Sequence, residues 1–357
     1  MKTLASSYSN FSGLGRYRMK TILYIGVFWT LIDSIVVLLL KDGNHKPFSF
    51  HLIRESAVFM ISCLIGYLFV FGLKNVFRRQ SPLVNFIFKS IILVLAAFAI
   101  NFLIHFVDSI LINGKDVQDA IKHSSDDMLQ LKLLARKILY WLILFAITQL
   151  YIEINEKYSP GVFLDIIRGK YMQPKTEKRI IMFMDLKDST PIAEKLGHVE
   201  NFKFIRDFIF HVSMALIDHD GRIYQYVGDE IVVSWLFTKR NTRKCMDSII
   251  AARKNLQKNS IQFRNMYGFI PEFRVGLHMG DVTVGQIGVI KKDLAMSGDT
   301  MNTTARIRSA CNDLNQKFIM SKDFMENSDL KEWQGESLGI VDLKGKTAGI
   351  ELFSIKI

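Results

Sequence analysis

Cysteine is scarce in this sequence, and the spacing of the few cysteines argues against a domain held together by disulfides or by structural zinc. Only Cys63, Cys245 and Cys311 are present, with no close pair and no spacing typical of a zinc site. Neither a disulfide framework nor a structural zinc centre is therefore expected. The three thiols are interpreted as packing residues, because free cysteine behaves as a small hydrophobe.

Long apolar runs are absent from the second half of the chain, although 49% of the 357 residues are hydrophobic. The excess lies in four apolar stretches, each near the roughly 20 residues that a helix needs to cross a bilayer. These are residues 21–40, 56–73, 83–107 and 138–152. The first stretch also lacks the cleavage pattern of a signal peptide. We expect residues 1–153 to form an all-α four-helix transmembrane bundle surrounded by membrane lipid.

The charges that flank these stretches predict an orientation. Basic residues precede the first stretch and follow the second: Lys2, Arg16, Arg18, Lys20, Lys74, Arg78 and Arg79. The loop after the third stretch is instead rich in aspartate. By the positive-inside rule the N-terminus is cytoplasmic, and an even number of crossings returns the C-terminal half to the same side. This predicts a multi-pass protein of the inner (plasma) membrane.

The net charge of +12 does not by itself indicate a partner. An anionic membrane surface or a polyphosphate substrate explains the cations as well as DNA or RNA would. No nucleic-acid partner is predicted.

Three charged residues, Asp33, Glu55 and Lys89, fall in or beside the apolar stretches. An unpaired charge there costs at least about 2.5 kcal/mol, so each should face a partner or water. Two interpretations stay open: a ligand site within the bundle, or interhelical pairs that fix the helices together.

Downstream, residues 154–178 are expected to form a linker with a short amphipathic helix, and the pattern of residues 179–357 predicts short β-rich runs that alternate with helices. Residues 179–184 predict a buried strand that ends at Asp185, and residues 201–217 predict a helix. A hairpin is expected over residues 222–236, with Asp229 at its tip. A second hairpin is expected over residues 273–287, turning at Gly280 and Asp281.

Two side-chain arrangements suggest phosphate chemistry. Asp185 ends a strand beside a helix N-terminus, a placement that suits a metal–phosphate site. Asn302 and Arg306 are spaced i, i+4, so one helix face presents an amide and a guanidinium to a single phosphate group.

Five segments, taken together in order and spacing, resemble the motifs of class III adenylyl and guanylyl cyclases. They are FMDLKDST (183–190), YVGDEIVVSW (226–235), FRVGLHMGDVTVGQIG (273–288), SGDTMNTTARI (297–307) and LKGKTAGIELF (343–353). The resemblance implies a ferredoxin-like α+β catalytic domain over residues 179–357. A full GGDEF-type signature is absent, which argues against a diguanylate cyclase.

The resemblance also implies roles for individual residues. Asp185 and Asp229, helped by the Leu186 carbonyl, would hold two Mg²⁺ or Mn²⁺ ions. Asn302 would orient the ribose and Arg306 would stabilise charge on the α-phosphate.

Other implied contacts leave a choice open. Lys344 or Lys346 would bind the terminal phosphates. In the family the metal aspartates come from one protomer and the Asn and Arg from the other, so a homodimer is expected.

Base selection is the point at which this sequence departs from the family pattern. Gln225 and Ala295 occupy the positions that read the base, and they match neither the adenylyl nor the guanylyl pair. ATP is the favoured nucleoside triphosphate because adenylyl cyclases are the commoner bacterial form. The alternatives are a guanylate or other nucleotide cyclase, or a catalytically silent receptor.

Three further polar residues of the motif segments and their flanks are predicted to have structural roles only. Strand alternation is expected to point Glu230 away from Asp229. Arg308 is expected to be a surface helix residue, and His278 to be a hydrogen-bonded strand histidine.

Overall fold

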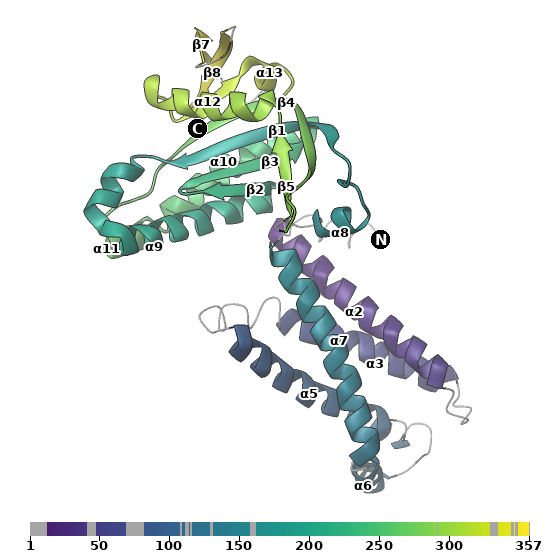
Figure 1. The fold of residues 1–357 in the computed structure, drawn as a ribbon. Coiled ribbons are helices and arrows are strands. Elements are labelled where there is room, and N and C mark those ends of the chain that lie inside the picture. The colour runs from purple at the N-terminus through teal and green to yellow at the C-terminus, as the bar shows by residue number, and fades with distance from the viewer. Residues whose placement is uncertain are drawn as a thin grey trace. The chain divides into compact units, whose positions relative to one another are not determined.

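The computed structural model describes residues 13–40, 48–68, 82–107, 109–110, 114, 116–128, 131–157, 162–290, 292–328, 335–343, 346 and 349–356. The chain divides into two compact units, Gly15–Lys157 and a second unit that contains Tyr158–Ile357. The first unit is helical, and the second unit contains the sheet (Figure 1).

The helices of the first unit are α2 (Gly13–Leu40), α3 (Phe48–Tyr67), α5 (Pro82–Val107), α6 (Val117–Met128) and α7 (Leu131–Lys157). The four expected apolar stretches are helical, except that residues 69–73 of the second lie outside the described residues. The polar helix α6 was not predicted. Within the described residues one helical segment, Arg18–Val36, is long and apolar enough to cross a membrane, while Phe86–Leu95 and Leu139–Ile154 are shorter apolar segments. A four-span bundle is therefore not shown.

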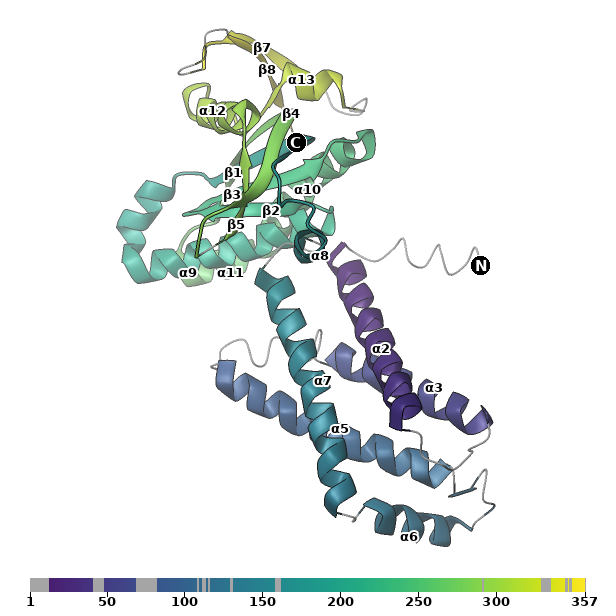
Figure 2. The same cartoon turned by 45° about the vertical axis from the view of Figure 1, so that its right-hand side comes forward.

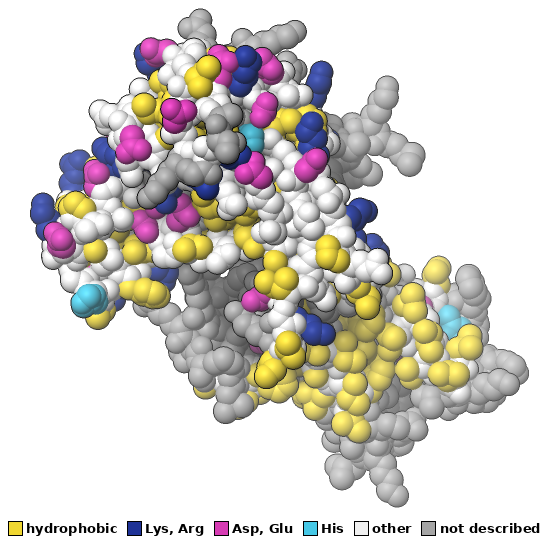
Figure 3. Space-filling model, turned by 45° about the horizontal axis from the view of Figure 1, so that its top comes forward, with side chains coloured by type: hydrophobic (Ala, Val, Ile, Leu, Met, Phe, Trp, Pro, Cys, Tyr) yellow, Lys and Arg dark blue, Asp and Glu magenta, His cyan; other side chains and the backbone are white. Residues whose placement is uncertain are grey.

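Large hydrophobic side chains cover the outside of this unit. Examples on the four long helices are Tyr24, Leu31, Leu38, Leu52, Met60, Leu64, Ile87, Ile91, Leu95, Leu139, Ile143 and Leu150. Figure 3 shows hydrophobic side chains gathered over the helical unit, whereas basic and acidic side chains are scattered over the other unit. An apolar exterior of this extent indicates a surface that is covered by something other than water.

The interior of the helical unit is partly polar. Arg54 Nη2 lies 2.9 Å from Asp33 Oδ2, and Lys89 Nζ donates a hydrogen bond of 3.0 Å to Gln149 Oε1. The expectation that Asp33 and Lys89 face partners is confirmed. Glu55 Oε2, in contrast, is buried without a hydrogen-bond partner among the described residues.

The second unit is built on one mixed sheet. Its strands are β1 (Lys175–Leu186), β2 (Arg222–Val227), β3 (Glu230–Leu236), β4 (Phe273–Ile287), β5 (Asp293–Ser297), β6 (Phe318–Ser321), β7 (Gly335–Val341) and β8 (Ile350–Ile355). The order across the sheet is β2-β3-β1-β4-β6-β8-β7, and β5 pairs with β4. The helices are α8 (Val162–Ile167), α9 (Ser189–Asp218), α10 (Lys239–Lys258), α11 (Ser260–Tyr267), α12 (Asp299–Asp313) and α13 (Lys322–Glu326).

Alternation along the central strand β1 assigns its side chains to two faces. Ile180, Met182 and Met184 point into the main core, where α9 contributes the buried Phe204 and Phe208. The opposite set, which ends in Asp185, faces the side on which α12 lies. In both cartoon views α9 and α10 lie on one side of the sheet and α12 on the other (Figure 2).

The prediction of a second hairpin over residues 273–287 is wrong. β4 continues without a turn through Gly280 and Asp281, because β1 pairs with it along its length, from Leu186 opposite Phe273 to Lys175 opposite Val284. The hairpin partner of β4 is β5, which follows it in the chain. The Gly-Asp pair therefore serves another purpose: a Cβ on Gly280 would lie 2.5 Å from Thr300 Oγ1. Glycine allows the first turn of α12 to approach the strand.

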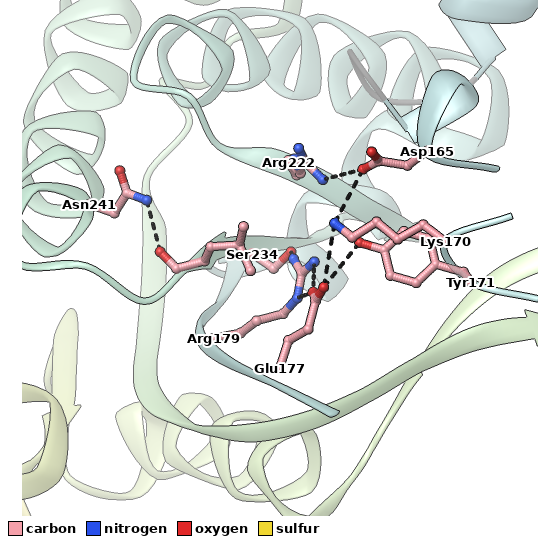
Figure 4. A network of polar contacts seen from close by, with 9 residues as sticks. Asp165, Lys170, Tyr171, Glu177, Arg179, Arg222, Ser234 and Asn241 are labelled. Carbon is pink, nitrogen blue, oxygen red and sulfur yellow. Dashed lines mark hydrogen bonds and ion pairs between the residues drawn. The ribbon is translucent and has the colours of Figure 1, made fainter. Parts of the chain in front are cut away.

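A polar network fixes α8 to the sheet (Figure 4). Asp165 of α8 forms ion pairs with Lys170 at 3.5 Å and with Arg222 of β2 at 3.6 Å. Arg179 is 1% exposed, and its guanidinium donates to Glu177 Oε2 at 2.6 Å and to Ser234 Oγ at 3.0 Å. The linker helix is thus anchored to the strands of its own unit.

Candidate active site

Asp185 lies near the end of β1, on the face turned toward α12. Burial raises its pKa to about 6, the Arg308 guanidinium opposes that rise, and the carboxylates of Asp229 and Glu230 add to it. Asp185 therefore lies within electrostatic reach of two further carboxylates, which come from another place in the sequence. Like charges held this close favour a cation between them.

Asp229 occupies the turn between β2 and β3, as the sequence predicts. Gly228 before it has a positive φ of 62°, a conformation that turns of this kind demand. The Oδ2 atom of Asp229 is buried and has no hydrogen-bond partner among the described residues. A buried carboxylate oxygen without a donor is costly unless a ligand or cation satisfies it.

Arg308 and Glu230 are the functional neighbours that the sequence analysis missed. Arg308 Nη1 lies 3.2 Å from Asp185 Oδ2, and its Nε donates to Glu230 Oε2 at 2.7 Å. The interpretation of Arg308 as a surface residue is wrong, because its side chain is only 23% exposed. A signal was present: Arg308 shares the i, i+4, i+7 stripe of the buried Thr304 and Cys311.

The sequence also carries a signal for the face on which Glu230 lies. Glu230 has the same strand parity as Ser234, whose hydroxyl meets Arg179 on the face that carries Asp185. Counting strand alternation from Asp229 assigns Glu230 to the wrong face, because Asp229 belongs to the turn and not to the strand.

Asn302 and Arg306 lie on a different face of α12. Arg306 precedes Arg308 by two residues, which places it about 200° around the helix. Asn302 is exposed and Arg306 is half-buried. Since Arg308 takes the side that faces Asp185, the structure does not bring Asn302 and Arg306 to the carboxylates of the same chain.

The remaining predicted residues are distributed as follows. Gln225 is exposed on β2 and Ala295 is half-buried on β5, and Tyr224 Oη, beside Gln225, accepts a hydrogen bond from the Met296 N–H at 3.1 Å. The positions expected to read the base thus lie on strands that touch. Leu186 ends β1 with a buried side chain.

Only one of the two candidate phosphate lysines is among the described residues. Lys344 lies outside the described residues. Lys346 forms an ion pair with Asp299, the first residue of α12, and this hydrogen bond from Lys346 holds the pKa of Asp299 below its usual range. Lys346 is therefore placed at the end of α12 that carries Asn302.

His278 is a buried strand histidine, as expected. Its Nδ1 lies 2.7 Å from Ser321 Oγ, and burial lowers its pKa.

Comparison with known families decides what this arrangement belongs to. Residues 171–356 match the family described as Adenylate and Guanylate cyclase catalytic domain. The chain belongs to this family. The class III cyclase resemblance drawn from five motifs is thereby confirmed, and the cyclase domain includes β1 in full.

Individual relatives are distant. The chain is 27% identical over 206 residues to "Adenylate cyclase 2" of Rhizobium meliloti (strain 1021), covering 57% of each. It is 27% identical over 150 residues to "Guanylate cyclase 2G" of Rattus norvegicus, covering 41% of this chain and 14% of that one. The chain thus spans little more than half, or less, of the curated relatives that it matches.

The fold agrees with that of a solved cyclase. A bacterial light-regulated adenylyl cyclase has a TM-score of 0.52 and 20% identity, over 60% of this chain and 62% of that one. This supports the cyclase catalytic fold that the motifs imply, which the structure builds on a mixed sheet.

A divalent metal is compatible with the carboxylates of the cyclase domain. Asp185 and Asp229 together supply hard carboxylate oxygens, and the Oδ2 atom of Asp229 has no other partner among the described residues. Mg²⁺ commonly takes one or two carboxylates and completes its shell with phosphate and water. No group of three or more His, Cys, Asp or Glu residues suited to a metal occurs in the described part of the chain. The two aspartates therefore leave most of the metal shell to water and to phosphate oxygens.

Proposed function

We propose that this protein is an adenylate cyclase that converts ATP into 3′,5′-cyclic AMP and pyrophosphate. The observation that carries the proposal is the convergence of Asp185 and Asp229 in a domain of the cyclase family, with the buried Asp229 oxygen left without a donor. Two carboxylates in this state suit cations that bridge to a triphosphate. A catalytically silent receptor would have no physical need for them.

The residues divide the chemistry between them. Asp185, Asp229 and the Leu186 carbonyl would hold two Mg²⁺ or Mn²⁺ ions, which when bound would activate the ribose 3′-hydroxyl and neutralise the triphosphate. Asn302 orients the ribose, and Arg306 stabilises the charge that develops on the α-phosphate. The 3′ oxygen gives up its proton to solvent and bonds to the α-phosphorus, while the bond from that phosphorus to pyrophosphate breaks. Lys344 or Lys346 would hold the leaving phosphates.

We infer that the active site is shared between two chains of a homodimer. Arg308 occupies the side of α12 that faces Asp185, so Asn302 and Arg306 point elsewhere. They can serve these carboxylates only from a second copy. Two equivalent sites follow from the two-fold symmetry of such a dimer.

The choice of nucleotide rests on Gln225 and Ala295. A glutamine amide both donates and accepts, so it can meet the N6/N1 edge of adenine or part of guanine. Ala295 offers no polar side chain. Discrimination should accordingly be modest, because a site lacking a polar contact rejects the wrong base weakly.

The deciding experiment identifies products by mass after the purified protein is incubated with each nucleoside triphosphate and Mn²⁺ or Mg²⁺. Cyclic AMP as the main product supports the proposal, and cyclic GMP alone would replace it with a guanylate cyclase. Dimeric protein that makes no cyclic product with either metal would instead support the silent receptor.

We also propose that the helical unit crosses the inner (plasma) membrane four times, with the N-terminus and the cyclase domain in the cytoplasm. Outward-facing apolar side chains on α2, α3, α5 and α7 and polar contacts inside the unit support this. The test is high-pH carbonate extraction of membranes together with labelling of cysteines introduced between the helices. Release of the protein by carbonate, or an odd number of crossings, would contradict the proposal.

A further inference from the structure

Among the described residues, Arg308 is the one cation placed on the carboxylates of the candidate active site. It bridges Asp185 Oδ2 at 3.2 Å and Glu230 Oε2 at 2.7 Å. All three side chains are largely buried, with exposed fractions of 23% for Arg308, 17% for Asp185 and 13% for Glu230. Water therefore screens these pairs less than it screens a surface salt bridge.

The fold is shaped to bring this guanidinium so close. Gly276 of β4 lies beneath Arg308, and a Cβ there would come within 2.5 Å of the Arg308 backbone nitrogen. Any other residue at position 276 would push α12 away from the sheet. Arg308 is thus held against Asp185 by backbone contact as well as by charge.

We propose that Arg308 is a positioning residue that acts as a built-in counter-cation: it fixes Asp185, keeps Glu230 away from the metal, and competes with the metal for the carboxylate charge. This inference rests on the proposed function, because it takes Asp185 and Asp229 as the metal ligands. Asp185 then has only Oδ1 free of the guanidinium. The pair that Arg308 forms with Glu230 is neutral, so the charge left for metal is that of the two aspartates.

Two effects of removing Arg308 oppose each other. Loss of the positive charge, and release of Glu230 as a third carboxylate, both favour binding of a divalent cation. Loss of orientation at Asp185 opposes productive binding, as loss of a supporting partner usually does at metal sites. We expect the loss of charge to dominate the metal affinity, which should rise. We expect the loss of orientation to dominate the turnover rate, which should fall.

The test measures Mn²⁺ binding to the nucleotide-free full chain by electron paramagnetic resonance of free Mn²⁺, alongside kcat for cyclic product. Arg308→Leu should bind Mn²⁺ more tightly, on the order of tenfold, while kcat falls. Glu230→Gln, which leaves Arg308 to Asp185 alone, should bind Mn²⁺ more weakly. The double variant should return toward wild-type affinity, and Arg264→Leu, which removes an exposed arginine of α11, should change neither quantity.

Arg308→Lys keeps the test decisive if the leucine variant does not fold. Lysine retains the charge but not the planar fork that bridges two carboxylates, so Mn²⁺ affinity should stay near wild type while kcat falls. The inference is overturned if folded Arg308→Leu or folded Glu230→Gln leaves Mn²⁺ binding unchanged, or if Arg308→Leu binds Mn²⁺ more weakly. In either case an active wild type preserves the proposed function. A wild type that neither binds Mn²⁺ nor makes product would overturn the proposed function itself.

Discussion

At the scale of single residues, two arginines in the interior of this domain each meet a carboxylate partner. Arg179 is buried but meets Glu177 and Ser234, and Arg308 meets Asp185 and Glu230. Burial makes each ion expensive and its partner necessary. The two arginines differ in purpose: the first joins strands, and the second lies in the candidate active site.

The Glu177–Arg179 pair gives a prediction about stability. Arg179→Leu should lower the free energy of unfolding by about 3–5 kcal/mol, because it leaves the buried carboxylate without its guanidinium. Burial alone would raise the pKa of Glu177, but the hydrogen bond and charge of Arg179, with Lys170, hold it below its ordinary 4.5. The measurement is thermal and denaturant unfolding of the full chain.

The same pair predicts the sign of a pH dependence. A depressed carboxyl pKa stabilises the fold above the unfolded value of 4.5, and this stabilisation is lost as the pH falls below 4.5 toward the lower folded value. Glu177→Gln should therefore flatten the acid limb of stability against pH in that window. An unchanged acid limb would contradict the assignment.

At the scale of elements, the position of α12 depends on glycines in β4. The helix carries Asn302 and Arg306 on one side and Arg308 on another, so a small rotation would misplace all three. Gly276 and Gly280 lie under its middle and its first turn. Their role is to permit close approach, which explains why the Gly-Asp pair at 280–281 is not a turn.

Gly280→Ala should destabilise the protein by about 1–3 kcal/mol, because the added methyl group overlaps Thr300 Oγ1. The clash should be relieved in part by Thr300→Ala, so the double variant should be less destabilised than the sum of the two single variants. Midpoints of urea unfolding would measure this. Strict additivity would show that the close contact is not the cause.

At the scale of the whole molecule, the proposed site draws on two faces that the structure does not bring together within one chain. Asp185 and Asp229 lie near one end of β1 and in the β2–β3 turn, while Asn302 and Arg306 point away from them. Under the proposed shared site, association of two chains becomes part of the chemistry. Under the proposed membrane topology, anchoring two copies in one membrane would raise their effective concentration.

Complementation tests the shared site. Asp185→Ala and Arg306→Ala should each be inactive, but their co-expression should restore about a quarter of wild-type activity, since half of randomly formed dimers would carry one intact site of two. Co-expression of Asp185→Ala with Asp229→Ala is the matched control, because both changes affect the same half-site. Proven heterodimers of the first pair without activity would remove the shared-site proposal.

The sequence alone predicted most of the long elements and named the residues of the candidate site. Apolar runs and alternation predict the helices and the strand that ends in Asp185, since these patterns report local burial. Five motifs in register identify the family, and they name Asp229, Asn302 and Arg306. These are properties of residues near one another in the chain.

Only the tertiary structure decided which distant residues meet. The Arg308–Asp185–Glu230 contacts join three elements, and the passage of β4 through Gly280 depends on pairing with β1 and on the approach of α12. No local pattern encodes such contacts, because whether a glycine turns the chain or admits a helix depends on what packs against it. For the same reason the partner of a charged residue emerges only when the sheet and its helices are assembled.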